Sequence, residues 1–371
     1  QSQNLTTATN TNNVAVGYLA GGSITTGIQN VLVGAGAGDA LTDSDFNIAI
    51  GYNSLSADTL GDRSVAVGVN TLAVQNFTTS TQAYNTAVGH NTGAAVTTGT
   101  QNTLIGGLAG DAITTATHNV AVGVDALSTN TTASRNVAVG RSALATMNRT
   151  DDADSYNTGV GWFAGAIITT GTSNTLIGGL AGDNLQAADD NTAVGTGALG
   201  ADSLGVQTTA IGRSSLAAQN FSTSTTTYNT AVGTNSGLDL TTGTQATLIG
   251  HSAGANLTDA DFNVVVGTNA LVTDTLGSKS VAIGTQALAT QNFTTATDSH
   301  NIGIGYQTGL LITTAVQNTL VGSLSGDAIT TGNNNCAFGA FTLSANQTGA
   351  QNTAVGTQAL NVVTASNNTA V

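Results

Sequence analysis

Twenty glycines recur along this chain at three equal intervals followed by a longer one, and this series of four then starts again. They are Gly17, Gly34, Gly51, Gly68, Gly89, Gly106, Gly123, Gly140, Gly161, Gly178, Gly195, Gly212, Gly233, Gly250, Gly267, Gly284, Gly305, Gly322, Gly339 and Gly356. So short a segment buries no core of its own, and each interval must form a coil that is stable only when stacked on its neighbours. The spacing therefore predicts a solenoid in which four coils are the unit of duplication.

Each glycine closes a copy of one short phrase, such as NVAVG at 13–17, NTLIG at 102–106 and SVAIG at 280–284. β-Branched residues dominate its apolar positions, and the surrounding Thr, Asn and Gly break any helical period. The chain has no proline to interrupt a ladder, and its 4% aromatic content indicates a thin core of small side chains. We predict an all-β fold, a parallel β-solenoid (β-roll) of about twenty 17- or 21-residue coils, as a single continuous repeat domain over residues 1–371. The Val or Ile before each glycine is expected to point inward.

The residue that opens the phrase is Asn in 16 of the 20 coils, with Ser64, Thr208, Ala246 and Ser280 in the others. We predict that these amides stack coil upon coil as a hydrogen-bonded ladder, as in cross-β stacking. A glycosylated or catalytic Asn is the alternative. Thr pairs, as at 97–98, also recur at one place in the coil and are expected to form rows.

The phrases SVAVG, SVAIG and NTAVGTQAL resemble the YadA-like head repeat of trimeric autotransporter adhesins and the similar repeats of phage tail-fibre proteins. The resemblance covers nearly the whole chain. It implies a left-handed parallel β-roll in which three chains wrap around a common axis to form an elongated attachment fibre. The coils of this chain depart from the YadA-like pattern, whose coil is typically shorter and lacks the regular lengthening of every fourth copy. A single-chain three-sided solenoid is the competing architecture, and the hand of the coil stays open.

The extra residues of the 21-residue coils lie at 75–84, 147–156, 219–228 and 291–300, and residues 3–12 match the same stretch. Because coils stack, these segments should form loops that protrude from one side of the solenoid. The candidate contact residues in them are Phe77, Tyr84, Arg149, Tyr156, Phe221, Tyr228 and Phe293. Contact with a host receptor or glycan is one interpretation. The other, which we favour, is that the aromatic pair clamps each loop onto its own solenoid or onto a neighbouring chain.

Each of these segments also contains an N-x-S/T sequon. The asparagines are Asn4, Asn76, Asn148, Asn220 and Asn292, one in each copy of the four-coil unit. In a secreted eukaryotic or archaeal protein they would carry a row of glycans on exposed loops. Duplication of one chance sequon in a chain rich in Asn and Thr gives the same pattern, so glycosylation is one of two interpretations.

Other motifs give no support for a catalytic, cofactor or metal site. GGLAGD at 106–111 superficially resembles a calcium-binding nonapeptide, but its Asp recurs only once in four coils, which favours an Asp that caps its turn. The four histidines do not all occupy one position in the coil, which argues against a metal row. Cys336 is the only cysteine, so no intrachain disulfide is possible. We predict no cofactor, no metal and no enzymatic activity.

The chain is acidic, with 20 acidic and 6 basic residues and a net charge of -14. This charge disfavours nucleic acid and anionic membrane surfaces as partners. No segment approaches the ~20 apolar residues of a membrane span, so we predict no membrane insertion in this segment. The chain starts within a coil and ends at Val371, just before the place of the next glycine, so we interpret it as a window of a longer fibre.

Three functions remain compatible with these features. The first is a structural and adhesive fibre segment, outside the cell on a cell surface or on a virion, which forms a homotrimer and binds a host surface receptor or glycan. The second is a surface-binding solenoid whose Thr rows meet a crystal lattice such as ice, which would need two Thr in every coil. The third is a solenoid enzyme acting on polysaccharide, which would need an acidic cluster on one face. The regular repeat and the dispersed Asp residues favour the first.

Overall fold

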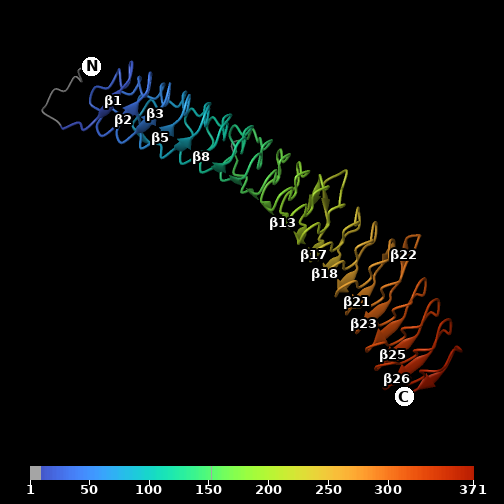
Figure 1. Ribbon diagram of the computed structural model, residues 1–371. Helices are drawn as coiled ribbons and strands as arrows, with labels where there is room; N and C mark the ends of the chain where they lie inside the picture. The colour runs from blue at the N-terminus through green and yellow to red at the C-terminus, as the bar shows by residue number, and fades with distance from the viewer. Residues whose placement is uncertain (1–9, 152) are drawn as a thin grey trace. The chain divides into compact units, whose positions relative to one another are not determined.

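The computed structural model describes residues 10–151 and 153–371, and within them the secondary structure consists of strands and turns without helices. The chain divides into two compact units, Gln1–Ala188 and Asp189–Val371. In each unit the strands of successive coils pair in parallel and lie side by side in sequence order (Figure 1). Each unit is thus a parallel β-solenoid, which confirms the predicted fold class.

The first unit contains a ladder with one three-residue strand from each described coil. In pairing order its strands are β1 (Val14–Val16), β2 (Val31–Val33), β3 (Ile48–Ile50), β5 (Val65–Val67), β7 (Thr86–Val88), β8 (Thr103–Ile105), β9 (Val120–Val122), β10 (Val137–Val139), β11 (Thr158–Val160) and β12 (Thr175–Ile177). Val137 pairs with Val120 on one side and with Thr158 on the other. The partners are therefore one short coil or one long coil apart, as the glycine spacing predicts.

The second unit repeats this ladder. In pairing order its strands are β13 (Thr192–Val194), β15 (Thr209–Ile211), β17 (Thr230–Val232), β18 (Thr247–Ile249), β19 (Val264–Val266), β21 (Val281–Ile283), β23 (Ile302–Ile304), β24 (Thr319–Val321), β25 (Cys336–Phe338), β26 (Thr353–Val355) and β27 (Thr369–Ala370). The last pair is offset by a shorter coil, with Thr353 opposite Thr369. The two units are therefore built by the same rule.

The glycine that closes each strand is required by its backbone angle and by space. At Gly123 φ is 140°, and a Cβ there would lie 2.5 Å from the carbonyl oxygen of Gly140 in the next coil. At Gly51 the corresponding distance to the oxygen of Gly68 is 2.1 Å. L residues avoid this φ, and no Cβ fits so close to a carbonyl. Within each unit the glycines therefore stack directly, because the backbones of successive coils touch at this corner.

The three-residue strands after β1 bury their middle residue, so the expectation that the Val or Ile before the glycine points inward is wrong. Leu104 and Ala121 in the middle of β8 and β9 are fully buried, whereas Ile105 at the end of β8 is exposed. The buried face is the one that also carries the Asn of the phrase. The narrow interior accepts that amide and a single Ala or Leu, and the alternating strand then turns the β-branched residues outward.

The asparagines that open the phrase form the predicted buried ladder, but its main links run from side chain to backbone. Asn102 Nδ2 donates to the carbonyl of Ala116 at 2.9 Å, and Asn102 Oδ1 accepts the N–H of Asn119 at 3.0 Å. The direct amide contact, from Asn102 Nδ2 to Asn85 Oδ1, is longer at 3.3 Å. Each amide thus satisfies a turn carbonyl and a strand N–H, which contributes about 0.5–1.5 kcal/mol per hydrogen bond.

Threonine hydroxyls form a second row at a turn. Thr97 Oγ1 donates to the carbonyl of Thr114 at 3.2 Å, and Thr114 Oγ1 donates to that of Thr131 at 3.1 Å. These hydroxyls satisfy turn carbonyls of the next coil, so the predicted Thr rows are confirmed as hydrogen-bonded features of the turn.

The four-coil period arises from the way the core is filled. In two coils of each set the fourth residue after the glycine is Gly, because a Cβ on Gly110 would lie 2.8 Å from the side chains of Leu104 and Ile113. In the other two coils a buried Leu takes this place, as Leu127 does with φ of 54°. The residue three positions later is then free to be polar, as Asn130 is. In most coils one large apolar side chain at these two positions fills the space, and its site alternates; one coil carries both, as Leu144 and Met147.

In three of the long coils a buried glutamine lies beside a buried carboxylate of the preceding coil, at these polar core positions. Gln75 Nε2 donates to Asp58 Oδ2 at 2.7 Å and to Ser64 Oγ at 3.0 Å, and Gln75 Oε1 accepts from Asn85 Nδ2 at 2.8 Å. We call this set an Asp–Gln cluster. It recurs as Asp202, Thr208, Gln219 and Asn229, and as Asp274, Ser280, Gln291 and Asn301.

The Asp–Gln clusters explain three of the four exceptions to the Asn ladder. Ser64, Thr208 and Ser280 each supply a hydroxyl that accepts a hydrogen bond from the Gln amide. An Asn at these places would present its own amide where the Gln side chain now lies. Nothing in the structure explains Ala246.

The buried carboxylates make the stability of the protein depend on pH. Burial raises the pKa of Asp58, Asp202 and Asp274 above the ordinary value of 3.8, against the opposing effect of their N–H donors. The folded chain therefore holds these protons more tightly than the unfolded chain. Their contribution to stability is complete below pH 3.8 and is lost as the pH rises through the folded-state pKa values.

We expect urea unfolding to show this dependence when the protein is compared with the variant Asp58→Asn, Asp202→Asn and Asp274→Asn. From acidic to neutral pH the parent chain should lose more free energy of unfolding than the variant, because the amides do not ionise. Asn130 and Asn346 show that this core position accepts Asn. Parallel pH profiles for the two proteins would contradict the assignment.

Candidate contact surfaces

The extra residues of each long coil form a loop that is tied to the preceding coil. In the first unit the tie is the pair β4 (Gly61–Asp62) and β6 (Thr81–Gln82). In the second unit it is β14 (Gly205–Val206) with β16 (Thr225–Thr226), and β20 (Gly277–Ser278) with β22 (Thr297–Asp298). The loop at 147–156 has a single bridge instead, from Ser134 to Asp154. The loops are therefore fixed parts of the solenoid.

The phenylalanines of these loops are buried. Phe77, Phe221 and Phe293 are 6%, 6% and 5% exposed. The ring of Phe77 lies against Gly61, where a Cβ would be 2.7 Å from it, and the backbone N–H of Phe77 donates to Asp58. These three residues anchor the loop to the preceding coil, and their rings are not accessible to a partner, so they are withdrawn as candidate contact residues.

The tyrosines of the loops are exposed. Tyr84, Tyr156 and Tyr228 are 47%, 54% and 62% exposed, and His300 takes the same place in the fourth loop. Tyr156 accepts a hydrogen bond from Arg135 Nη1 at 3.0 Å and donates to Asp154 Oδ2 at 2.9 Å. Each loop thus presents one aromatic or imidazole ring to solvent at a constant place in the repeat.

Arg149 gives the second loop a different chemistry. Its guanidinium forms two hydrogen bonds with Asp151, at 3.1 and 2.6 Å, and a weaker one with the carbonyl of Thr170 at 3.4 Å. These residues and Thr150 line a shallow hollow. The hydrogen bonds from Arg149 lower the pKa of Asp151, so at neutral pH the hollow combines a cation and an anion that are already paired.

The sequon asparagines differ in exposure. Asn76 and Asn220 are exposed, Asn148 and Asn292 are half-buried, and Asn4 lies outside the described residues. In each described copy the Asn Oδ1 accepts a hydroxyl from the preceding coil, as from Thr59 to Asn76 at 2.9 Å. The carbonyl side of the amide is therefore directed toward the solenoid in all four.

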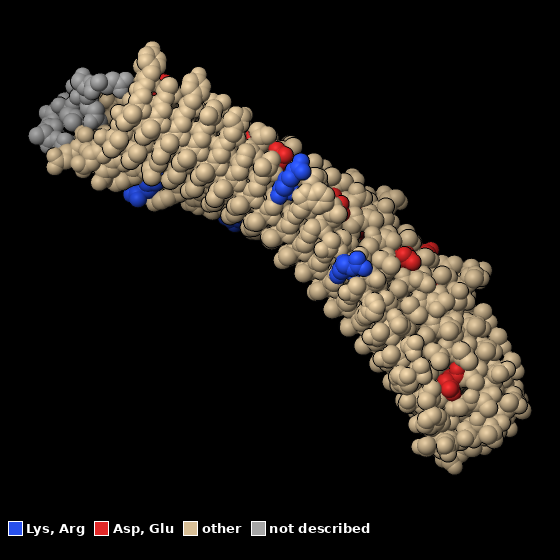
Figure 2. All heavy atoms as spheres, viewed as in Figure 1, with Lys and Arg blue, Asp and Glu red and all other residues tan. Residues whose placement is uncertain are grey.

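The outer face of each strand ladder is uncharged and open to solvent. Its outward positions carry mainly Val, Ile and Thr, and the strands of the two ladders contain no charged residue in the described chain. Ile50, Ile105 and Ile177 in the first unit and Ile211, Ile249 and Ile304 in the second are exposed. In the view of Figure 2 charged side chains are likewise sparse on the visible surface of each unit.

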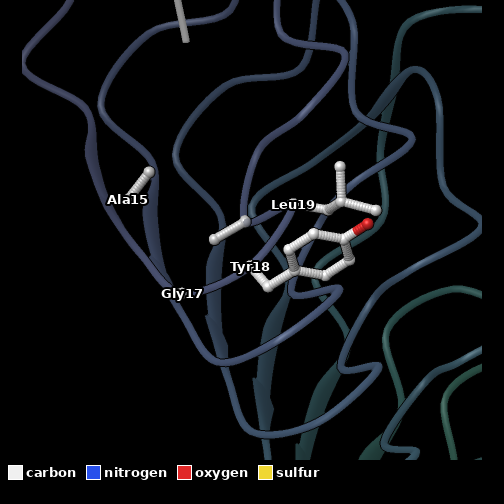
Figure 3. Close-up of a pocket in the computed structure, with 5 residues that line it drawn as sticks. Ala15, Gly17, Tyr18 and Leu19 are labelled. Carbon is white, nitrogen blue, oxygen red and sulfur yellow. The ribbon is translucent and has the colours of Figure 1, made fainter.

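A third surface lies at the corner directly after the glycine, where sequence analysis singled out nothing. Tyr18, Tyr52, Trp162 and Tyr306 occupy this place, and all are more than half exposed. Figure 3 shows the Tyr18 ring beside the side chain of Leu19, in a hollow that follows Gly17. The signal that could have found them is the appearance of large aromatics at a position that smaller or polar residues fill in the other coils.

The aspartates of the GGLAGD-type turns do not gather into a site. Asp39, Asp111 and Asp327 each have one buried Oδ1 without a hydrogen-bond partner, and burial raises the pKa of Asp111. Within residues 10–151 and 153–371, no group of three or more metal-ligating side chains comes together. Cys336 is half-buried at the start of β25.

No protein-family model, curated protein or solved structure matches this chain. No helix long and apolar enough to span a membrane occurs in the described part of the chain.

Proposed function

We propose that this chain is a structural and adhesive fibre segment, without catalytic activity, that displays contact surfaces at regular intervals on a cell surface or a virion. The loop geometry carries the proposal. Each loop is fixed to the preceding coil by backbone pairing, and its exposed ring, Tyr84, Tyr156, Tyr228 or His300, recurs at one place in the repeat. Such loops are suited to repeated weak contacts with a host receptor or glycan, whose summed effect is strong. The resemblance to YadA-like head repeats and phage tail-fibre repeats supports the same function.

Trimming the four loops tests this function. Each long coil would be shortened to the length of its neighbours by deleting its extra residues, and adhesion of the intact fibre to its host surface would be measured. We expect adhesion to fall strongly while the circular dichroism spectrum remains that of a β-solenoid. Unchanged adhesion with the fold intact would show that the loops are structural, and the same assay should then be applied to a Trp162→Ala and Tyr306→Ala variant of the corner row.

We further propose that three copies of the chain assemble in parallel through the outer faces of their ladders. A face of Val, Ile and Thr without charge exposes apolar surface in every coil. Its burial is favourable by about 25 cal/mol per Å². Closed cyclic symmetry buries this face on every copy, whereas a single chain leaves it exposed to solvent.

Light scattering tests the assembly. We expect a mass of three chains for the parent protein, each of 36.5 kDa. The variant Val122→Glu with Val139→Glu should dissociate, because charges would enter the interface. The exposed turn variant Thr98→Glu adds the same kind of charge outside the ladder and should remain trimeric. A monomeric parent chain in dilute native buffer would refute the trimer.

The two other function classes receive less support. An ice-binding face requires two Thr in every coil, but the row of Thr pairs is broken at Ala187 to Asp190, in the coil after Thr169 and Thr170. A polysaccharide-acting enzyme requires a cluster of carboxylates on an accessible face, and Asp58, Asp202 and Asp274 are not available for one because they lie in the core.

A further inference from the structure

The near identity of the coils creates a problem of register. Strands β9 and β10 have the same sequence, Val-Ala-Val, and pair residue by residue. If the chain skipped one coil, the strands on either side of it would still pair, and their closing glycines would still stack. The ladder alone therefore does not specify which coil lies on which.

The Asp–Gln clusters distinguish the coils because each cluster takes different side chains from three consecutive coils. Counted from the residue that opens each phrase, Asp58 comes from one coil, Ser64 and Gln75 from the next, and Asn85 from the third. All four are fully buried, so any of them left without its partner would be an unsatisfied polar group in the core.

We propose that the three Asp–Gln clusters are register locks, which prevent the solenoid from closing with a coil left out. Skipping the coil that carries Gln75 would stack Asp58 on the coil of Val96, and the buried carboxylate would lose its side-chain donor. Skipping the coil that carries Asp58 would place the Gln75 amide against the coil of Leu41. The first error leaves Asp58 Oδ2 without its donor, and the second leaves one N–H of the Gln75 amide without its acceptor, whereas both are paired in the correct stack.

The second long coil lacks the lock and provides an internal comparison. Asn130 replaces the Asp, and its side chain is satisfied within its own turn, through the carbonyl of Ala133 at 2.8 Å and the N–H of Ala133 at 3.1 Å. Met147 replaces the Gln, and Asn136 replaces the Ser or Thr. The three positions therefore change together: Asp, Ser or Thr, and Gln in three copies, but Asn, Asn and Met in this one. Asn346 is satisfied in the same way within its own turn, by the carbonyl and the N–H of Gly349.

The test converts the locks into the form of the second long coil. The full chain would carry Asn, Asn and Met at the three cluster positions of all copies, through Asp58→Asn, Ser64→Asn and Gln75→Met and the equivalent changes at 202, 208, 219, 274, 280 and 291. The chain would be unfolded in urea, refolded and digested with a protease. Mass spectrometry would then locate the cuts. A skipped coil is a long exposed loop, so it is cut within a strand phrase that is protected in the correct stack. The variant Ile113→Val is the control for lost stability. It would be refolded at the temperature at which its unfolding midpoint equals that of the converted chain.

We expect the fraction of refolded variant cut within strand phrases to rise several-fold over the parent and over Ile113→Val. A rise no larger than that of Ile113→Val would overturn the proposal, since the clusters would then contribute stability alone. If the full variant fails to fold, the same digestion would be applied to a chain that carries only Asp58→Asn, Ser64→Asn and Gln75→Met. Cuts confined to the coils around residues 58–85 support a lock, and cuts spread evenly along the chain overturn it.

Discussion

Replacing Gly123 by Ala is expected to destabilise the solenoid by about 3 kcal/mol or more. The new Cβ would lie 2.5 Å from the carbonyl oxygen of Gly140, and the residue would keep a φ of 140° that alanine avoids. Backbone atoms form this contact, so neither side can move without breaking the ladder on both sides. Urea unfolding followed by circular dichroism measures the loss.

Gly107 provides the matched control. It stands next to Gly106, in the coil before Gly123, and a Cβ on it would meet no atom within 4 Å. Gly107→Ala should change the free energy of unfolding by no more than about 0.5–1 kcal/mol. Equal losses for Gly123→Ala and Gly107→Ala would mean that the close stacking of glycine backbones does not limit this fold.

Leu104→Ala is expected to cost about 2–5 kcal/mol, because it opens a cavity that the surroundings cannot fill. Leu104 is fully buried, and its methyl groups occupy the space that Gly93 and Gly110 leave open. The N–H groups of both glycines donate to carbonyls of the next coil, so the backbone has no room to collapse inward. Thermal and urea unfolding of the variant give the magnitude.

Ile105→Ala, one residue further along the same strand, separates the two faces of the ladder. Ile105 points outward and is exposed, so its truncation should cost about 1 kcal/mol or less in the dissociated chain. A loss for Ile105→Ala as large as that for Leu104→Ala would contradict the assignment of the inner face.

The glycine spacing was sufficient to predict the coil, its length and the parallel register. Gly123 and Gly140 stack and Val120 pairs with Val137 because a glycine whose Cβ would enter the next backbone fixes one point of every coil. The Asn ladder and the Thr rows were also predictable, since a repeated polar residue in a stacked coil must meet its copies or the turns beside them. The Gly, Gly, Leu, Leu order was visible as well, although its cause, the alternating site of the large core side chain, was not.

The sequence by itself determined that coils stack and where each begins, because those properties depend on spacing along the chain. Only the tertiary structure decided which side chains lie inside. A Val-Ala-Val strand is apolar on both faces, and the small middle residue is buried because the interior also holds the Asn amides. Phe77 and Tyr84 are both loop aromatics, yet Phe77 is buried against Gly61 while Tyr84 is exposed. Asp58 and Gln75 become partners because their coils stack, and the same packing buries both side chains.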